Sequence, residues 1–299
     1  MSPGDVRRVP DSTDVYYLDT GMYDVPEYGT VYLIDGAEPA VIDTGIGADR
    51  ERVFAALEEV GIGRDGLEHV LVTHVHLDHA GGAGYLAAES PDATVHVHER
   101  GRRHLVDPER LVAGTKAAVG DQWAYYDEPA PVPEARTSAL AGGDAVDLGD
   151  RRLRVTEAPG HAPHQVTFHD PAADLLFTGD AAGIWSPSAG RVFPTSPPPQ
   201  FDLERALADV EAMRALDPGV LCFGHFGPKA YEGAVLEEYE GVLTDWVETV
   251  RATREERDDD ATVEHLAANP DPEAVEVWGR RKAAAETRLN AKGVLASLD

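Results

Sequence analysis

The segment THVHLDH at residues 73–79 carries the side chains best suited to metal chemistry. It follows an apolar run that predicts a buried strand. Side chains two positions apart share one face of an extended chain, so His74 and His76 would point the same way. If the backbone then turns into a helix, Asp78 and His79 can reach a neighbouring point in space. The spacing therefore suits two metal ions side by side, each with nitrogen and oxygen ligands.

Three shorter motifs with histidine or aspartate also follow apolar runs. Each lies at the C-terminal end of a predicted strand, and one rim of the predicted sheets would gather all of them. These motifs are Gly160-His161, Thr178-Gly179-Asp180 and Gly224-His225.

Two strand-rich halves, each closed by helices, are predicted to position this rim. In the first half, antiparallel strands end at the turn Asp43-Thr44-Gly45, and Asp49 is expected to cap an amphipathic helix. In the second half, Asp202 is expected to cap a helix that precedes a buried strand at 220–223. Strands packed between outer helices predict a sandwich. The other strands of the second half are expected at 145–148, 153–158, 165–169 and 175–178.

Two segments stand outside this pattern. Residues 105–140 are rich in proline and contain Trp123, Tyr125 and Tyr126, so we interpret them as a mobile or substrate-facing insertion. From Lys229 onward the pattern is helical. We therefore predict a catalytic domain at 1–228 and a helical C-terminal extension at 229–299.

Charge is the strongest compositional feature. The 299 residues include 54 acidic and 26 basic side chains, giving a formal net charge of −28. Such a surface disfavours binding to a phosphate backbone, which depends on clustered lysine and arginine. Because salt screens self-repulsion within a few ångströms, we expect a salt-rich, halophilic cytoplasm.

Several classes of protein are excluded or disfavoured. No apolar stretch approaches the roughly 18 residues needed to cross a bilayer. The N-terminal segment lacks the apolar run of a secretory signal, which favours a cytoplasmic location. The single cysteine, Cys222, excludes an intramolecular disulfide or a cysteine-rich zinc finger, and its apolar neighbours suggest a buried side chain. A small-molecule substrate is expected, and the oligomeric state is left open.

The five motifs, in their order along the chain, resemble those of the metallo-β-lactamase superfamily. That pattern is an Asp at a strand end, His-x-His-x-Asp-His, a His, an Asp and a final His, and here it spans roughly residues 14–228. The resemblance implies an α/β fold, the four-layer αββα sandwich, with a metal site on one edge and the helical extension added. The matching residues are Asp43, His74, His76, Asp78, His79, His161, Asp180 and His225.

The resemblance also implies a ligand set. One metal would be bound by His74, His76 and His161, and a second by Asp78, His79 and His225. Asp180 would bridge the two ions, and Asp43 would orient a ligand histidine through its free N–H. Two divalent metals are expected, with Zn²⁺ favoured and iron as the alternative.

Within the superfamily, the glyoxalase II-like and lactonase-like branch is the most similar. Residues 160–164, Gly-His-Ala-Pro-His, look like the Gly-His-x-x-Gly-His motif of that branch, with Pro163 in place of glycine. True β-lactamases usually carry Cys or Ser at the position of Asp180, which disfavours antibiotic hydrolysis. We therefore predict a hydrolase of a small ester, thioester or lactone that uses a bridging metal-bound hydroxide. Asp78 would orient the water, and the helical tail would cover one side of the pocket.

Three other functions stay open at this point. The first is an iron oxygenase of the persulfide dioxygenase type, which would use chiefly His74, His161 and Asp180. The second is a ribonuclease Z-like nuclease, and the third is a metal-bearing scaffold without turnover. For Ile184, Trp185 and Phe193, a pocket lining and core packing are equal expectations, whereas His96, His98 and His164 are expected in local structural roles.

Overall fold

Strands rich in β-branched and aromatic residues form a seven-stranded first sheet in the computed structural model, which describes residues 1–298. Its first four strands pair antiparallel, and the last four pair in parallel. In sheet order they are β1 (Val6–Arg8), β2 (Val15–Asp19), β3 (Thr30–Ile34), β4 (Ala40–Ile42), β5 (His69–Leu71), β6 (Thr94–His98) and β7 (Thr137–Leu140).

Parallel strands need crossover connections, and helices supply them here. Helix α1 (Arg50–Glu59) connects β4 to β5, and α3 (Ala83–Glu89) leads from the histidine segment toward β6. The longer connection between β6 and β7 contains α4 (Glu99–Val106), α5 (Glu109–Val119) and the 3-10 segments η3 (Gly120–Tyr125) and η4 (Glu134–Arg136).

The second sheet has six strands and is antiparallel except where β11 and β14 run parallel. Helix α6 (Leu203–Leu216) precedes β14, and the Asp202 side chain caps it by accepting from the Arg205 N–H at 3.1 Å. In sheet order the strands are β15 (Gly227–Ala230), β14 (Val220–Phe223), β11 (Leu175–Gly179), β10 (Val166–Asp170), β9 (Arg152–Glu157) and β8 (Ala145–Asp147). A separate hairpin comprises β12 (Ile184–Ser186) and β13 (Arg191–Phe193).

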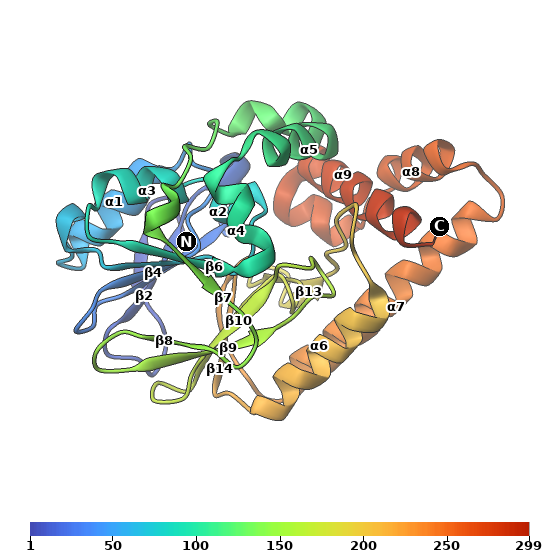
Figure 1. Ribbon diagram of the computed structural model, residues 1–299. Coiled ribbons are helices and arrows are strands. Elements are labelled where there is room, and N and C mark those ends of the chain that lie inside the picture. The colour runs from blue at the N-terminus through green and yellow to red at the C-terminus, as the bar shows by residue number, and fades with distance from the viewer. Residues whose placement is uncertain (299) are drawn as a thin grey trace.

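Three apolar layers hold the sheets and helices together. Leu57 of α1 and Leu86 of α3 pack with Val70 on the outer face of the first sheet. Between the sheets, Leu71 packs with Phe177, and both side chains are buried. The predicted αββα sandwich is confirmed (Figure 1).

The C-terminal helices are α7 (Ala234–Arg254), α8 (Asp259–Ala268) and α9 (Pro272–Ser297). Buried residues of α7 join those of α6 and the outer face of the second sheet in one apolar cluster. The chain then folds back, and α9 reaches α5 at the top of Figure 1. Among residues 1–298, no helix combines the length and apolar character needed to cross a bilayer.

Three local predictions were wrong. Residues 105–140 are largely helical and not irregular, because aromatic and aliphatic side chains of α5 and η3 pack into one apolar cluster. The expected substrate-facing position agrees with the cavity described below, which part of this segment lines. Lys229 lies in β15, and the helices begin only at Ala234. Asp49 occupies the N-cap position of α1 but provides no side-chain cap, since its carboxylate accepts no hydrogen bond from the helix. The domain boundary at residue 228 stays a prediction, and Asp299 lies outside the described residues.

Candidate metal centre

All seven predicted ligand residues meet at one rim of the sandwich. The histidine segment follows β5 and turns into the short helix α2 (Leu77–Ala80), whereas the other residues follow β9, β11 and β14. The ring centres of His74 and His79 are 4.2 Å apart, those of His74 and His161 5.0 Å, and those of His79 and His225 4.8 Å. Residues more than 140 positions apart in the chain are therefore neighbours here.

The side chains form two triplets that share no member, and within each one the ligand atoms lie within 4.8 Å of one another. One triplet is His74, His76 and His161, and the other is Asp78, His79 and His225. A third such group, His74, His79 and Asp180, overlaps both. Asp180 lies between them: its carboxylate is 3.1 Å from His79 Nε2, 3.5 Å from His161 Nε2 and 3.8 Å from His225 Nε2.

Two imidazoles face each other in a way that requires a cation. His79 Nδ1 is 2.9 Å from the Asp43 carboxylate, and His225 Nδ1 is 3.0 Å from the Tyr28 carbonyl oxygen. Both partners only accept, so each Nδ1 carries a proton and each Nε2 faces the other ring. These two Nε2 atoms are 3.2 Å apart. Without a metal, the carboxylates of Asp180 and Asp43 outweigh burial and raise the pKa of His79 well above its usual value, so a proton occupies this position unless a metal ion replaces it.

The chemistry of the donors fits divalent metals. His74 Nε2 is buried without a hydrogen-bond partner among residues 1–298, and the buried Asp180 Oδ1 faces only the ring nitrogens of the ligand histidines His79 and His225. Buried polar atoms are normally paired, so these two are oriented for a ligand that is not a protein atom. Imidazole nitrogens together with carboxylate oxygens are typical ligands of Zn²⁺ and similar ions.

Asp43 fixes the geometry from behind the rim. It accepts from the Thr73 backbone N–H at 2.8 Å and from the Thr73 hydroxyl at 2.9 Å, while holding His79 Nδ1. The chain is also packed too tightly for a side chain next to His225, since a Cβ on Gly224 would lie 2.8 Å from Cε1 of His79. Asp43 and Gly224 thus set the position of two facing imidazoles.

Electrostatics leave two of the histidines neutral and both carboxyls ionised. Burial lowers the pKa of His74 well below its usual value and that of His161 to about 3, so both rings are neutral. Burial alone would raise the pKa of Asp180, but the neighbouring His79 and His225 outweigh it and lower the pKa. For Asp78, contacts with His225 and His79 likewise outweigh burial and lower the pKa, so both carboxyls are ionised.

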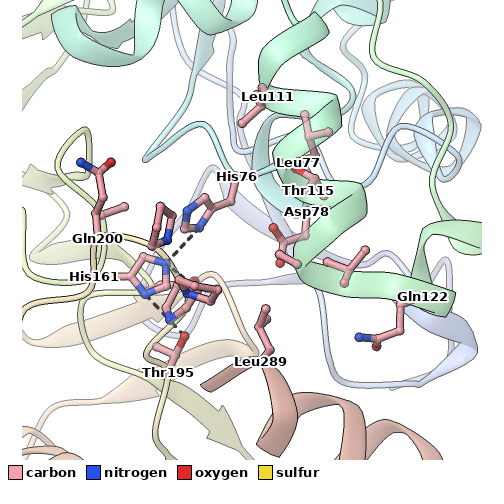
Figure 2. A pocket seen from close by; sticks show the side chains of 18 of the residues that line it. His76, Leu77, Asp78, Leu111, Thr115, Gln122, His161, Thr195, Gln200 and Leu289 are labelled. Carbon is pink, nitrogen blue, oxygen red and sulfur yellow. Dashed lines mark hydrogen bonds and ion pairs between the residues drawn. The ribbon is translucent and has the colours of Figure 1, made fainter. Parts of the chain in front are cut away.

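A cavity of about 450 Å³ opens onto these residues. His76 and Asp78 are only partly buried and face it, and Figure 2 shows both side chains above His161 and Thr195. One wall comes from α5 and η3, with Leu111, Thr115 and Gln122, and the opposite wall from Leu289 of α9 (Figure 2). The helical tail therefore does cover one side of the pocket.

A buried charge pair from the tail was missed by the sequence analysis. Lys282 Nζ is 2.7 Å from Glu286 Oε2 and lies over the rings of Tyr23 and Tyr28, at 4.0 Å and 4.2 Å from their centres. The Tyr28 hydroxyl donates to the same Glu286 oxygen at 2.8 Å. A Lys and a Glu one helical turn apart are ordinarily a surface pair. Only the chain fold shows that these two line the cavity.

The remaining candidates have mixed outcomes. His164 lines the cavity and accepts from the Val75 N–H at 3.4 Å, and Ile184 also lines it. Trp185 and Phe193 are packed in apolar clusters outside the lining. Cys222 is buried between the sheets, and burial raises the pKa of its thiol, which makes it inert.

Residues 24–225 match the metallo-beta-lactamase superfamily, so the chain belongs to this superfamily. The first crystal structure of an archaeal member, ST1585 from Sulfolobus tokodaii, superposes with a TM-score of 0.70 at 24% identity. The superposition covers 95% of this chain and 99% of the ST1585 chain. This likeness establishes the fold.

Named relatives are similar over the same region. ST1585 of Sulfurisphaera tokodaii, a metallo-beta-lactamase fold-containing protein, is 29% identical over 226 residues, covering 73% of this chain and 81% of its own. The human acyl-coenzyme A thioesterase MBLAC2 is 28% identical over 56% of this chain. A hydroxyacylglutathione hydrolase of Cereibacter sphaeroides is 30% identical over 68%. The matches span 62% and 66% of the lengths of these two enzymes.

Proposed function

We propose that this protein is a dinuclear, divalent-metal-dependent hydrolase of thioesters or esters. The observation that carries the proposal is the pair of facing Nε2 atoms of His79 and His225, 3.2 Å apart in one of two adjoining ligand triplets. A divalent ion at this position would be coordinated by both nitrogens and would take the place of the proton on His79. Membership of a hydrolase superfamily supports the same conclusion.

The two triplets would each hold one ion, with Zn²⁺ favoured by the predominance of imidazole nitrogen. His74, His76 and His161 would bind the first ion, and Asp78, His79 and His225 the second. Asp180, which lies between the triplets, would contact both. When bound, such ions lower the pKa of a coordinated water to about 7 and polarise the oxygen of a substrate carbonyl.

The chain's own groups perform the remaining steps. Asp78 is ionised and reaches the cavity, so it can accept a hydrogen bond from the attacking water, orient it, and pass the proton to the leaving thiol or alcohol. The hydroxyls of Tyr23 and Tyr126 contact each other within the cavity lining and offer polar groups to the substrate. The walls from α5 and α9 shield the reacting bond from bulk water.

The choice of bond rests on the relatives. The human relative is a thioesterase by name, and the bacterial ones are named hydroxyacylglutathione hydrolases. A thioester therefore comes first, a simple ester second, and a lactone stays a prediction from the sequence.

The test combines metal analysis with a substrate panel. The purified enzyme is expected to hold about two zinc ions per chain, to cleave a thioester at the highest kcat/KM of the panel, and to lose activity on chelation. One iron per chain with oxygen consumption would instead support the persulfide dioxygenase alternative. Bound metal with no cleavage of thioester, ester, lactone or precursor transfer RNA would leave only the scaffold.

We also propose a salt-rich cytoplasm as the working environment, because the net charge of −28 repels itself where salt is scarce. Unfolding during dialysis into low salt is the expected result. Full stability there would contradict the proposal.

A further inference from the structure

Two arginines at the cavity stand apart from the ion-paired arginines of the acidic surface. Arg103 of α4 and Arg110 of α5 both line the cavity and are exposed. Among residues 1–298, neither guanidinium has a carboxylate within 4.0 Å. Arg102, the neighbour of Arg103, is paired by contrast with Glu134 at 3.5 Å and donates to Thr137 at 2.6 Å.

His104 ties these two cations together. Arg103 Nε donates to His104 Nε2 at 3.3 Å. Partial burial lowers the pKa of His104, and the nearby charges of Arg103 and Arg110 lower it further, so both guanidiniums act on the same ring. The three side chains thus form one basic patch on the cavity wall, and we call it the α4–α5 patch.

This patch is continuous with the metal centre. Helix α4 packs on the loop that carries His161 and His164: Arg100 Nη1 donates to the Pro163 carbonyl at 3.4 Å. His164 in turn lies 5.6 Å, between ring centres, from His76. A single substrate lying along this loop would therefore contact both the ligand triplets and the α4–α5 patch.

Charge complementarity indicates what the patch binds. A guanidinium matches carboxylate and phosphate with paired hydrogen bonds. The surrounding surface, with its net charge of −28, repels anions, so an anionic substrate needs a local positive site to bind. The acids of the cavity are already engaged, since Asp78 and Asp180 lie among the histidines and Glu286 pairs with Lys282.

We propose that Arg103 and Arg110 bind the anionic group of the carrier thiol, so that the enzyme selects acyl thioesters whose carrier bears phosphate or carboxylate. The acyl group then lies toward the apolar wall formed by Leu111, Val119 and Leu289. This inference rests on the proposed function, because it assigns the leaving group of that hydrolysis.

The test compares three thioesters with the same acyl group on the metal-loaded enzyme. Acyl-coenzyme A carries phosphates, S-acylglutathione carries carboxylates, and S-acyl-N-acetylcysteamine is uncharged. The variants are R103Q, R110Q and the double variant, with R154Q as the matched control, because Arg154 is exposed on β9 and lies outside the cavity lining. Thermal unfolding of each variant verifies that the fold is intact.

We expect the double variant to raise KM and lower kcat/KM about tenfold for one or both anionic thioesters, with kcat nearly unchanged. The neutral thioester and R154Q should stay within about twofold. A loss confined to acyl-coenzyme A identifies phosphate as the ligand, and a loss confined to S-acylglutathione identifies carboxylate. An equal loss on the neutral thioester, or no loss on either anionic one, overturns the proposal.

Calorimetric binding of coenzyme A and glutathione separates this proposal from the proposed function. If the wild type cleaves none of the three thioesters but binds one carrier through Arg103 and Arg110, the assignment of the patch is supported and the assignment of a thioester as the substrate bond is contradicted. If thioesters are cleaved and neither carrier binding nor KM depends on the two arginines, only the assignment of the α4–α5 patch is contradicted. Absence of both thioester cleavage and arginine-dependent binding overturns both the patch assignment and the thioester assignment.

Discussion

The metal-centre rim and the cavity wall are built by opposite means. The rim residues sit on short loops directly after strands, and each side chain is held by a specific polar contact such as that of Asp43 with His79. The wall comes from helices inserted into or added to the sandwich, α4, α5 and α9, whose side chains pack mainly by shape. The comparison indicates that the rim determines the reaction, whereas the wall determines which substrate fits the cavity.

The largest expected effect lies at the rim. Asp180→Asn removes the negative charge between the two triplets, so kcat/KM for the best thioester should fall on the order of 10³-fold. Steady-state kinetics and metal analysis measure the effect. The control is Asp92→Asn, because Asp92 is exposed and remote from the cavity lining. A fall in kcat/KM of less than threefold for Asp180→Asn would contradict the view that the rim, and not the wall, determines the chemistry.

At the wall, stability is the sensitive quantity. Lys282→Met leaves the buried carboxylate of Glu286 without its cation and should lower the free energy of unfolding by about 3–4 kcal/mol. Lys282→Met combined with Glu286→Gln removes the unpaired charge and should recover most of this loss. Urea unfolding of these two variants and of Glu286→Gln alone measures the coupling. Additive losses would mean that the two side chains do not act as a pair.

These two regions also differ in how far the sequence predicts them. The positions of His74, Asp180 and His225 at the rim can be predicted from the sequence. Local rules place these side chains, namely alternation along a strand and a turn at the end of the strand. The burial of the Lys282–Glu286 pair cannot be predicted from the sequence, because it depends on α9 folding back across the cavity. The prediction of irregular structure for residues 105–140 was wrong for a related reason. The prolines and aromatic residues suggest irregular structure, yet tertiary packing stabilises α5 and η3.

A buried histidine away from the rim offers a further comparison. His96 lies on β6, with Nε2 2.9 Å from His69 Nδ1, and His69 contacts Glu38. Burial, with a smaller contribution from His69, lowers the pKa of His96 to about 4 from its ordinary 6.5. The unfolded chain therefore takes up the proton first, and stability present above pH 6.5 is lost as the pH falls toward 4.

Protonation of His96 is therefore predicted to lower the free energy of unfolding by about 2–3 kcal/mol between pH 7 and pH 4. His96→Gln should therefore narrow the difference in unfolding free energy between pH 7 and pH 4 by that amount. The rim histidines titrate equally in both proteins, so the difference between them isolates His96. Identical pH dependence in the two proteins would show that His96 is not buried neutral.

The smallest effect is expected behind the rim. Asp43→Asn keeps the shape but weakens the acceptor that fixes His79, so affinity for the metal should fall about 10- to 100-fold. Competition with a chelating dye measures this. Unchanged affinity would mean that the geometry of His79 is set by packing alone.

Metal stoichiometry in matched variants tests the central claim most directly. Inductively coupled plasma mass spectrometry on the wild type, His76→Ala and His225→Ala compares the two triplets, each of which loses one member. We predict about two metal ions per chain in the wild type and about one in each variant. A wild type that binds no metal when refolded with Zn²⁺, or variants that keep two ions, would contradict the account.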